Sequence, residues 1–239
     1  MSERSKFWLV SIITLLAVGV TLALGRWQLS RATEKERLQA SIEARAHLAE
    51  LEGASLLGPM PADLLIHRRI SVSGRWLAAH TVFLDNRQMN ARPGFHVVTP
   101  LQLEGSRQAV LVQRGWAPRN FNDRAQVPKI DTPPGVVEVT GRIAPPPAKL
   151  YELGGPQAGP IRQNLDLAQF SGEMGVPLVP VSILQTAASS DGLLRDWPVV
   201  SAGSDKNYGY AFQWFGLSAL IAALYVWFQI VRRFKRRPR

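Results

Sequence analysis

An uncharged, apolar segment near the C-terminal end most constrains how this chain can fold. No residue from Tyr208 to Val231 is charged. At about 1.5 Å of rise per residue, a helix over this segment would be about 36 Å long, which is enough to cross a bilayer with some tilt. Residues 232–239 follow at once and include six basic side chains and no acidic one. Such a cluster beside a spanning helix indicates the cytoplasmic side, so we expect Tyr208 at the opposite interface.

A second apolar run, from Phe7 to Leu24, follows a short basic stretch, residues 1–6. Its length as a helix, about 27 Å, is just sufficient to span. A cleaved signal peptide is the alternative, but the run is long for one and no clean small-residue cleavage site follows it. We therefore expect both termini in the cytoplasm and residues 25–207 on the outer side. An N-terminus this short leaves no room for an organelle transit peptide, which favours a bacterial inner membrane.

Composition and motifs exclude several classes of protein. The net charge is +10, but the tail of residues 232–239 alone contributes +6, so the basic balance indicates membrane topology and not nucleic-acid binding. The absence of cysteine excludes disulfides, thiolate metal sites and a cysteine nucleophile. The phosphate-binding, dinucleotide-binding and serine-hydrolase signatures are also missing. The four histidines form no metal-binding pair at short spacing. We therefore expect a protein that is not an enzyme and holds no metal site of its own.

The outer segment, residues 25–207, predicts one domain. Its first part, Thr33–Leu51, is rich in helix formers and lacks Pro and Gly, so we expect a helix that can continue the first span. Short β-branched runs bounded by Gly, Pro, Asn or Asp then predict strands over residues 81–87, 95–103, 109–117, 135–144 and 178–186. Pro180 argues that the last of these is an edge strand. We also expect a short helix near residues 164–170 and a loop or short helix over 118–128.

These elements define the expected fold class. It is an α+β membrane protein in which two transmembrane helices flank one outer-side, mostly antiparallel β domain. The β domain is expected to be barrel- or sandwich-like, with peripheral helices. The expected divisions are residues 1–6, span 7–24, domain 25–207, span 208–231 and tail 232–239.

Three polar or aromatic residues and one leucine share one face at the outer end of the second span. These are Tyr210, Gln213, Trp214 and Leu217, at i, i+3, i+4 and i+7. An interfacial aromatic belt with one tolerated Gln explains them as well as a binding face for an amphipathic ligand or a partner helix.

Four stretches of the chain, in order, resemble hallmark blocks of the surfeit locus protein one family, also called the Shy family. They are residues 25–35 (GRWQLSRATEK), 83–101 (FLDNRQMNARPGFHVVTPL), 110–118 (VLVQRGWAP) and 206–228 (KNYGYAFQWFGLSALIAALYVWF). The resemblance implies an assembly factor, or chaperone, for haem–copper oxidases, chiefly cytochrome c oxidase. It also implies transient handling of haem a without catalytic turnover. The implied partners are the large oxidase subunit, the machinery that makes haem a and the lipid bilayer.

The matching residues divide into two groups. Those expected to contact haem or a partner are Trp27, Gln28, Arg31, Asn207, Tyr210, Gln213 and Trp214. Those expected to be structural are Asp85, Asn86, Gly94, Arg114, Gly115 and Trp116, with Gly115 needed for a bulge or turn. Gly25 also matches the family, in the same block as Trp27. Arg26 and Arg31 are placed to pair with haem propionates, and lipid headgroups explain both equally well.

One departure from the family's pattern concerns the haem iron. Many members carry a His just before the second span, as the proposed axial ligand, where this chain has Asn207. Asn is a poor iron ligand and imidazole a good one. Either other groups hold the haem, or this member assists assembly without ligating iron. On helical spacing we expect Asn207 near the face of Gln213 and Trp214. The alternative function is a membrane-anchored periplasmic ligand-binding or sensor module; a hydrolase is disfavoured because no nucleophile–base pair is visible.

Overall fold

The structure is a computed structural model that describes residues 2–123, 126–151, 159–187, 191–197 and 203–232. The chain divides into two compact units, one made of residues 1–40 with 199–239 and the other of Ser41–Pro198. We describe them separately. The expected basic tail, residues 232–239, lies outside the described residues except for Arg232.

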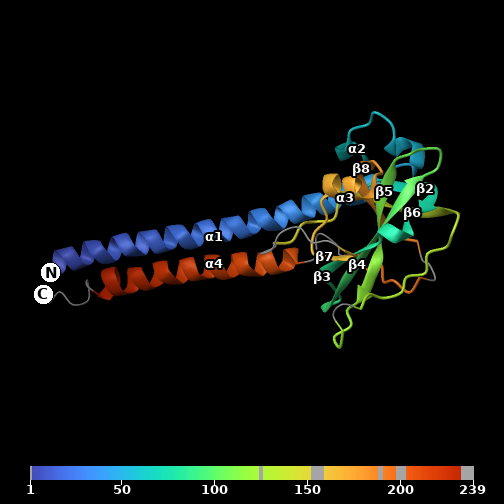
Figure 1. The fold of residues 1–239 in the computed structure, drawn as a ribbon. Coiled ribbons are helices and arrows are strands. Elements are labelled where there is room, and N and C mark those ends of the chain that lie inside the picture. The colour runs from blue at the N-terminus through green and yellow to red at the C-terminus, as the bar shows by residue number, and fades with distance from the viewer. Residues whose placement is uncertain (1, 124–125, 152–158, 188–190, 198–202, 233–239) are drawn as a thin grey trace, which may run out of the picture. The chain divides into compact units, whose positions relative to one another are not determined.

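The first unit is a pair of long helices that lie side by side (Figure 1). Helix α1 runs without a break over Glu3–Ala46, and α4 (Ser204–Tyr225) continues as a π-helical segment, η3 (Val226–Val231). Both are long and apolar enough to cross a membrane. The helix expected at Thr33–Leu51 is thus part of α1, but its predicted end was wrong. It stops at Ala46 because Leu51 pairs with Ile70 as the first residue of strand β1 (Leu51–Glu52).

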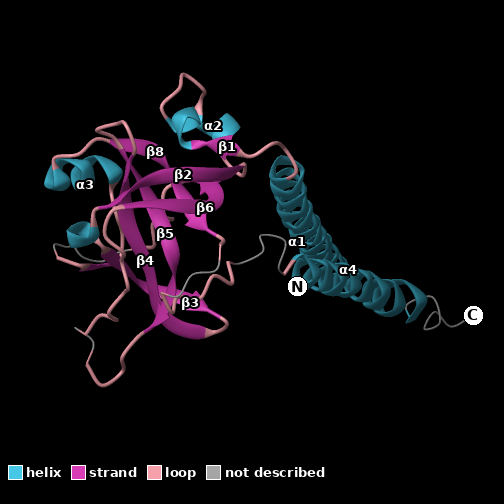
Figure 2. Ribbon diagram, turned by 90° about the vertical axis from the view of Figure 1, so that its right-hand side faces the viewer, coloured by secondary structure: helices cyan, strands magenta, loops and turns pink. Residues whose placement is uncertain are grey.

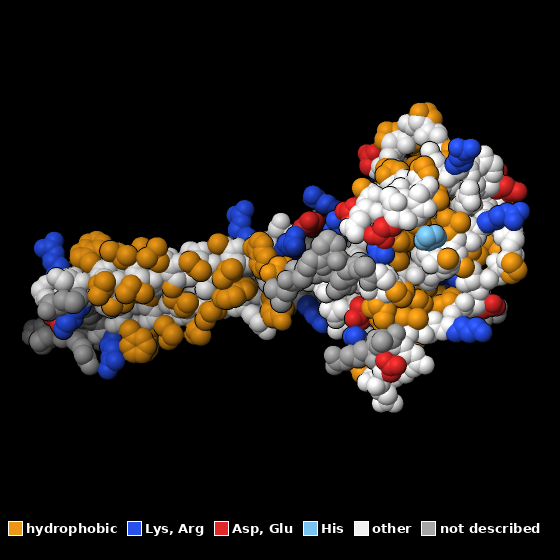
Figure 3. Space-filling model, in the orientation of Figure 1, with side chains coloured by type: hydrophobic (Ala, Val, Ile, Leu, Met, Phe, Trp, Pro, Cys, Tyr) orange, Lys and Arg blue, Asp and Glu red, His pale blue; other side chains and the backbone are white. Residues whose placement is uncertain are grey.

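Small and polar residues line the seam between α1 and α4. On α1 the buried and half-buried positions together recur every three or four residues, and the buried ones include Ser11, Thr21, Gly25 and Ala32; on α4 the buried ones include Ala211 and Ser218. The large apolar side chains point outward and cover the visible face of both helices (Figure 3). Small residues allow close backbone approach in helix pairs within lipid. Apolar residues outside and small ones inside therefore suit a pair that packs within a bilayer.

The second unit is built on one eight-stranded sheet, mostly antiparallel, most of which closes into a barrel (Figure 2). The closed ring runs in the order β2 (Arg69–Trp76), β6 (Val136–Ala144), β8 (Leu178–Gln185), β5 (Ala109–Pro118) and β4 (Arg92–Leu103). Antiparallel pairing of β2 with β4, from Gly74↔Leu103 to Trp76↔Leu101, closes it. Strand β3 (Val82–Met89) extends the sheet from β4 and pairs in parallel with β7 (Ile161–Arg162). The expected α+β class and β-barrel architecture are confirmed.

Strand β8 corrects one expectation, because it lies between β6 and β5 and is not at an edge. Pro180 is tolerated there by a local irregularity. Ala109 pairs with Leu178 and Leu111 pairs with Ser182, so β8 carries two extra residues around the proline. Pairing with β6 starts only at Ser182, so no ladder hydrogen bond needs the missing Pro180 N–H.

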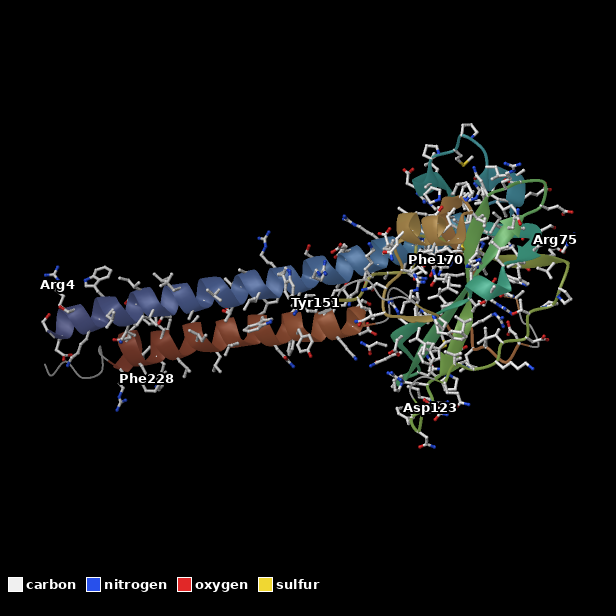
Figure 4. The ribbon with its side chains drawn as sticks, viewed as in Figure 1. Arg4, Arg75, Asp123, Tyr151, Phe170 and Phe228 are labelled. Atoms are coloured by element: carbon white, nitrogen blue, oxygen red, sulfur yellow. The ribbon has the colours of Figure 1, made fainter. Side chains whose placement is uncertain are left out.

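Short helices cover the barrel and its loops. They are η1 (Gly53–Leu56), α2 (Ala62–Leu65), η2 (Ala78–His80) and α3 (Leu167–Met174). The last confirms the short helix expected near residues 164–170, shifted by one turn because the Asp166 carboxylate caps it, accepting from the N–H groups of Ala168 and Gln169. Figure 4 labels Phe170 on α3, whose ring packs in a core cluster with Val82, Val98 and Leu111. The described part of residues 118–128 holds no helix.

Candidate functional site

The junction around Asn207 joins the two long helices. Its Nδ2 donates to Oε1 of Gln28 at 2.6 Å, and Nζ of Lys35 donates to its Oδ1 at 2.8 Å. Both ends of the Asn207 amide are therefore occupied by α1. One residue on, the Tyr208 hydroxyl donates to Oε2 of Glu36 at 3.1 Å. Gln28 and Lys35 are seven residues apart and so share the seam face of α1, which is the signal that could have predicted Lys35 as part of the site.

Position 207 therefore belongs to the seam, and the expectation that it lies near Gln213 was wrong. Six residues correspond to about 240° of rotation at 100° per residue, so the two side chains point in different directions. Trp214, seven residues on, returns toward the seam and is half-buried. Helical spacing thus correctly placed Asn207 near the face of Trp214, but it wrongly placed Asn207 near the face of Gln213.

Tyr210, Gln213 and Leu217 form an exposed face on α4, which we call the outer face. Tyr210 is 52% exposed and Leu217 is 42% exposed. Gln213 is also exposed, and its amide has no hydrogen-bond partner within the described residues. An amide directed into lipid is costly unless another helix or a ligand satisfies it. The outer face therefore has the chemistry of a contact surface within the membrane.

The side chains of the remaining candidate residues on α1 are exposed. Trp27 is 55% exposed, and Arg26 is also exposed. Arg31 forms an exposed pair with Glu34 at 2.7 Å, which is worth little and leaves the guanidinium available to another carboxylate. The structure thus brings Gln28 and Asn207 together in the seam and leaves Trp27, Arg31, Tyr210 and Gln213 outside it.

Gly25 has a packing role in the same helix pair. A Cβ built at this position would lie 2.7 Å from Cε1 and 2.8 Å from Cζ of Phe215. Only glycine lets the Phe215 ring pack this closely against α1. The sequence could single out Gly25 but could not name Phe215, because the register between the helices is set by contacts across the pair.

In the β domain, Trp116 and two glycines form one packed cluster. Trp116 is fully buried, and its Nε1 donates to the carbonyl of Arg87 at 3.0 Å. A Cβ on Gly94 would lie 2.3 Å from the Ala117 carbonyl oxygen and 2.5 Å from the Trp116 ring. A Cβ on Gly115 would lie 2.7 Å from Cβ of Leu193. These glycines are required by close approach around a buried ring.

Arg114 is the extra residue of the bulge expected at Gly115, because Gly115 pairs with Val97 while Gln113 pairs with Val98. Its buried guanidinium lies 3.3 Å from the Asp191 carboxylate, donates to Oγ1 of Thr132 at 2.7 Å, and stacks 4.7 Å from the centre of the Trp76 ring. These contacts hold the loops that contain Thr132 and Asp191 against strand β5 of the barrel.

Asp85 and Asn86 lie at an irregularity of β3, between Leu84 and Arg87. Asp85 pairs with Arg119 at 3.2 Å, and Asn86 adopts a left-handed φ of 58°. Both belong to local turn geometry, which agrees with a structural role.

The helix pair does not offer the haem ligand that the resemblance implies. The described part of this unit contains no His, Met or Cys, and the amide at position 207 is already hydrogen-bonded at both ends. All four histidines lie within Ser41–Pro198. Of these, His96 is held neutral, since burial and then the charge of Arg87 lower its pKa to about 4. No group of three or more His, Asp or Glu side chains that suits a metal ion occurs among the described residues.

Comparison with known proteins identifies the chain's family. A model of the SURF1 family matches residues 15–219. SURF1-like proteins of Rickettsia bellii and Rickettsia felis are each 24% identical, over 221 and 227 residues, covering 90% of this chain and 88% and 95% of theirs. Cytochrome oxidase assembly protein SHY1 of Saccharomyces cerevisiae is 25% identical over 97 residues, covering 41% of this chain and 25% of its own. The resemblance seen in the sequence is confirmed, and the chain belongs to the SURF1 family.

Proposed function

We propose that this protein is an inner-membrane assembly factor for a haem–copper (cytochrome c) oxidase. In this proposal it holds the large oxidase subunit through the outer face of α4 while haem a is delivered, and it does not ligate the iron itself. Both termini lie in the cytoplasm and the β domain lies in the periplasm. The SURF1-family match and the name of the yeast relative support the oxidase as the client.

The observation that carries the proposal is the exposed amide of Gln213 within an otherwise apolar span. Several other polar side chains of the two helices are hydrogen-bonded: the hydroxyls of Ser11 and Tyr225 lie 2.5 Å apart, and Thr21 donates to carbonyls of its own helix. Gln213 differs because it points away from the seam. A partner helix that offers a polar side chain would satisfy this amide, and Tyr210 and Leu217 would flank the contact.

A matched pair of substitutions tests the contact. Gln213→Leu removes the exposed amide, whereas Gln229→Leu makes the same chemical change at a half-buried position away from the outer face, at the other end of the same span, in η3. Interhelical hydrogen bonds of this kind contribute about 1–2 kcal/mol, so about 5- to 30-fold less large subunit should co-purify with the Gln213 variant. The Gln229 variant should co-purify as much as the parent. Equal co-purification by both variants and the parent would contradict the proposal.

A second experiment tests the role of Asn207. Co-expressed with haem a synthesis, the parent protein should purify nearly colourless, because its helix pair offers no imidazole. Asn207→His places an imidazole beside Gln28 and Lys35, and a gain in Soret absorbance per mole would indicate a lost ligand position. Near-stoichiometric haem in the parent would refute the claim that it does not ligate iron.

The alternative function, a periplasmic ligand-binding module, has one observation in its favour. A cavity of about 310 Å³ at the barrel end is lined by residues that include Trp76, Arg114, Gln185 and Asp191. Buried Oε1 of Gln185 has no hydrogen-bond partner among the described residues. If this cavity carries the function, a soluble version spanning residues 33–204 should complement a deletion strain. The assembly proposal predicts that it does not, because the outer face of α4 is then lost.

A further inference from the structure

We propose that the β domain carries an oxyanion-binding site, distinct from the oxidase contact, formed by Arg45, His67, Arg69 and Arg142. Its ligand is a phosphate group, either free or on a lipid headgroup. The site lies where β2 begins and β6 approaches its end, next to the last turn of α1.

The strand register places two of these arginines face to face. Arg69 of β2 and Arg142 of β6 are direct partners in an antiparallel pair. Side chains at such positions lie on the same face with Cβ atoms about 5 Å apart, and like charges there repel. His67 precedes Arg69 by two residues, and its Nδ1 lies 3.4 Å from NH1 of Arg142. Arg45 reaches the same turn, donating to the carbonyl of Ile66 at 3.0 Å.

No acidic side chain compensates this charge in the part of the chain that the structure describes. None of Arg45, Arg69 and Arg142 has a carboxylate within ion-pair distance there. Two buried arginines of the domain do have one, Arg114 with Asp191 and Arg162 with Glu173, whereas the buried Arg87 donates to the carbonyls of Ala148 and Gln163. The positive charge of Arg69 and Arg142 is therefore available to an anion from outside the chain.

The backbone conformation of His67 directs its side chain toward β6. Its φ of 75° lies in the left-handed region, which residues other than Gly adopt uncommonly. Hydrogen bonds to β6 hold this conformation: the His67 N–H donates to the Ile143 carbonyl at 2.8 Å, and the Ile143 N–H donates to the Arg68 carbonyl at 2.9 Å. This turn sets the imidazole beside Arg142. Burial, then Arg142 and Arg45, lower the pKa of His67.

These groups suit a phosphate oxyanion. Guanidinium groups bind phosphate oxygens through paired, charge-assisted hydrogen bonds. With Nδ1 accepting from Arg142, a neutral His67 carries its proton on Nε2 and can donate to the ligand as well. A bound anion would offset the repulsion between Arg69 and Arg142. It would also favour protonated imidazole, so binding should raise the pKa of His67.

The test uses the full-length protein in maltoside micelles, with isotope-labelled histidine, titrated with inorganic phosphate. We expect a saturable shift of the His67 resonance. Arg142→Gln should weaken binding at least about tenfold, and Arg69→Gln, at an exposed position that should not disturb folding, several-fold. Arg75→Gln is the matched control: it removes the same charge from the same strand, about 20 Å away, from an exposed position at the domain's edge (Figure 4).

The second arm replaces phosphate with micelles that contain phosphatidylglycerol. A shift that depends on Arg142 only in these micelles would assign the lipid headgroup as the source, and a shift with phosphate alone would assign the free anion. Either result supports the site. It is overturned if His67 shows no saturable response in either arm, or if Arg75→Gln weakens binding as much as Arg142→Gln and Arg69→Gln.

Discussion

Substitution by alanine should lower the stability of the protein at Gly94 and raise it at Gly172. At Gly94 an added methyl group would lie 2.3 Å from a backbone carbonyl oxygen and 2.5 Å from Trp116, which is fully buried. The carbonyl oxygen belongs to the backbone and the Trp116 ring is buried, so neither can move aside alone. Strands β4 and β5 must therefore shift apart to accept the methyl group. Overpacking of this kind costs about 1–3 kcal/mol, and the backbone contact places Gly94→Ala at about 3 kcal/mol or more. For a domain of this size the unfolding midpoint should fall by about 6–12 °C.

Gly172→Ala is the matched control within the same domain. Gly172 lies in α3, and a Cβ built there meets nothing within 4 Å. Alanine favours the helix by about 1 kcal/mol over glycine, so this variant should unfold about 2–4 °C higher. Thermal unfolding of the full chain in detergent, followed by near-ultraviolet circular dichroism of the buried tryptophan, measures both. A Gly94→Ala variant as stable as the parent, or equal losses in both variants, would refute the packing argument.

Three further predictions follow from buried charges and from topology. Arg114→Leu should cost about 1.5–3 kcal/mol in unfolding free energy, because Thr132 and the Asp131 carbonyl lose a charged donor, while Asp191 keeps its ion pair with Arg195 at 2.6 Å; chemical denaturation measures it. His96 should stay neutral down to about pH 4, so stability should fall by up to about 3 kcal/mol as pH drops from about 6.5 to 4; His96→Phe should remove this part of the pH dependence. Reporter fusions after Arg239 should report the cytoplasm and fusions near Gly105 the outer side; an outer C-terminus would overturn the proposed topology.

The sequence predicted most elements of the fold because their signals are local. The uncharged run from Tyr208 and the alternating β-branched runs depend on neighbouring residues alone. The choice between a barrel and a sandwich, and the strand order, could not be predicted, since the β2–β4 pairing that closes the ring joins Trp76 and Leu101, which are distant in the sequence. The edge assignment from Pro180 failed for a related reason: two extra residues in β8 remove the need for its N–H, and that compensation depends on the register with β5.

The candidate site was predicted in its residues but not in its geometry. Gln28, Asn207 and Gln213 were all named from the resemblance. Which of them meet depends on the rotation of α4 against α1, and no single-helix pattern fixes that rotation. The structure assigns Asn207 to the seam and Gln213 to the exposed side.

The assembly role is tested most directly by the haem a content of the oxidase in a strain that lacks this gene. Membranes from the parent, the deletion strain and the deletion strain complemented with the full chain are compared by reduced-minus-oxidised spectra, with the large subunit quantified by immunoblot. The proposal predicts a lower ratio of haem a to large subunit in the deletion strain, restored by the parent chain and not restored by Gln213→Leu. A normal oxidase content and spectrum in the deletion strain would contradict it.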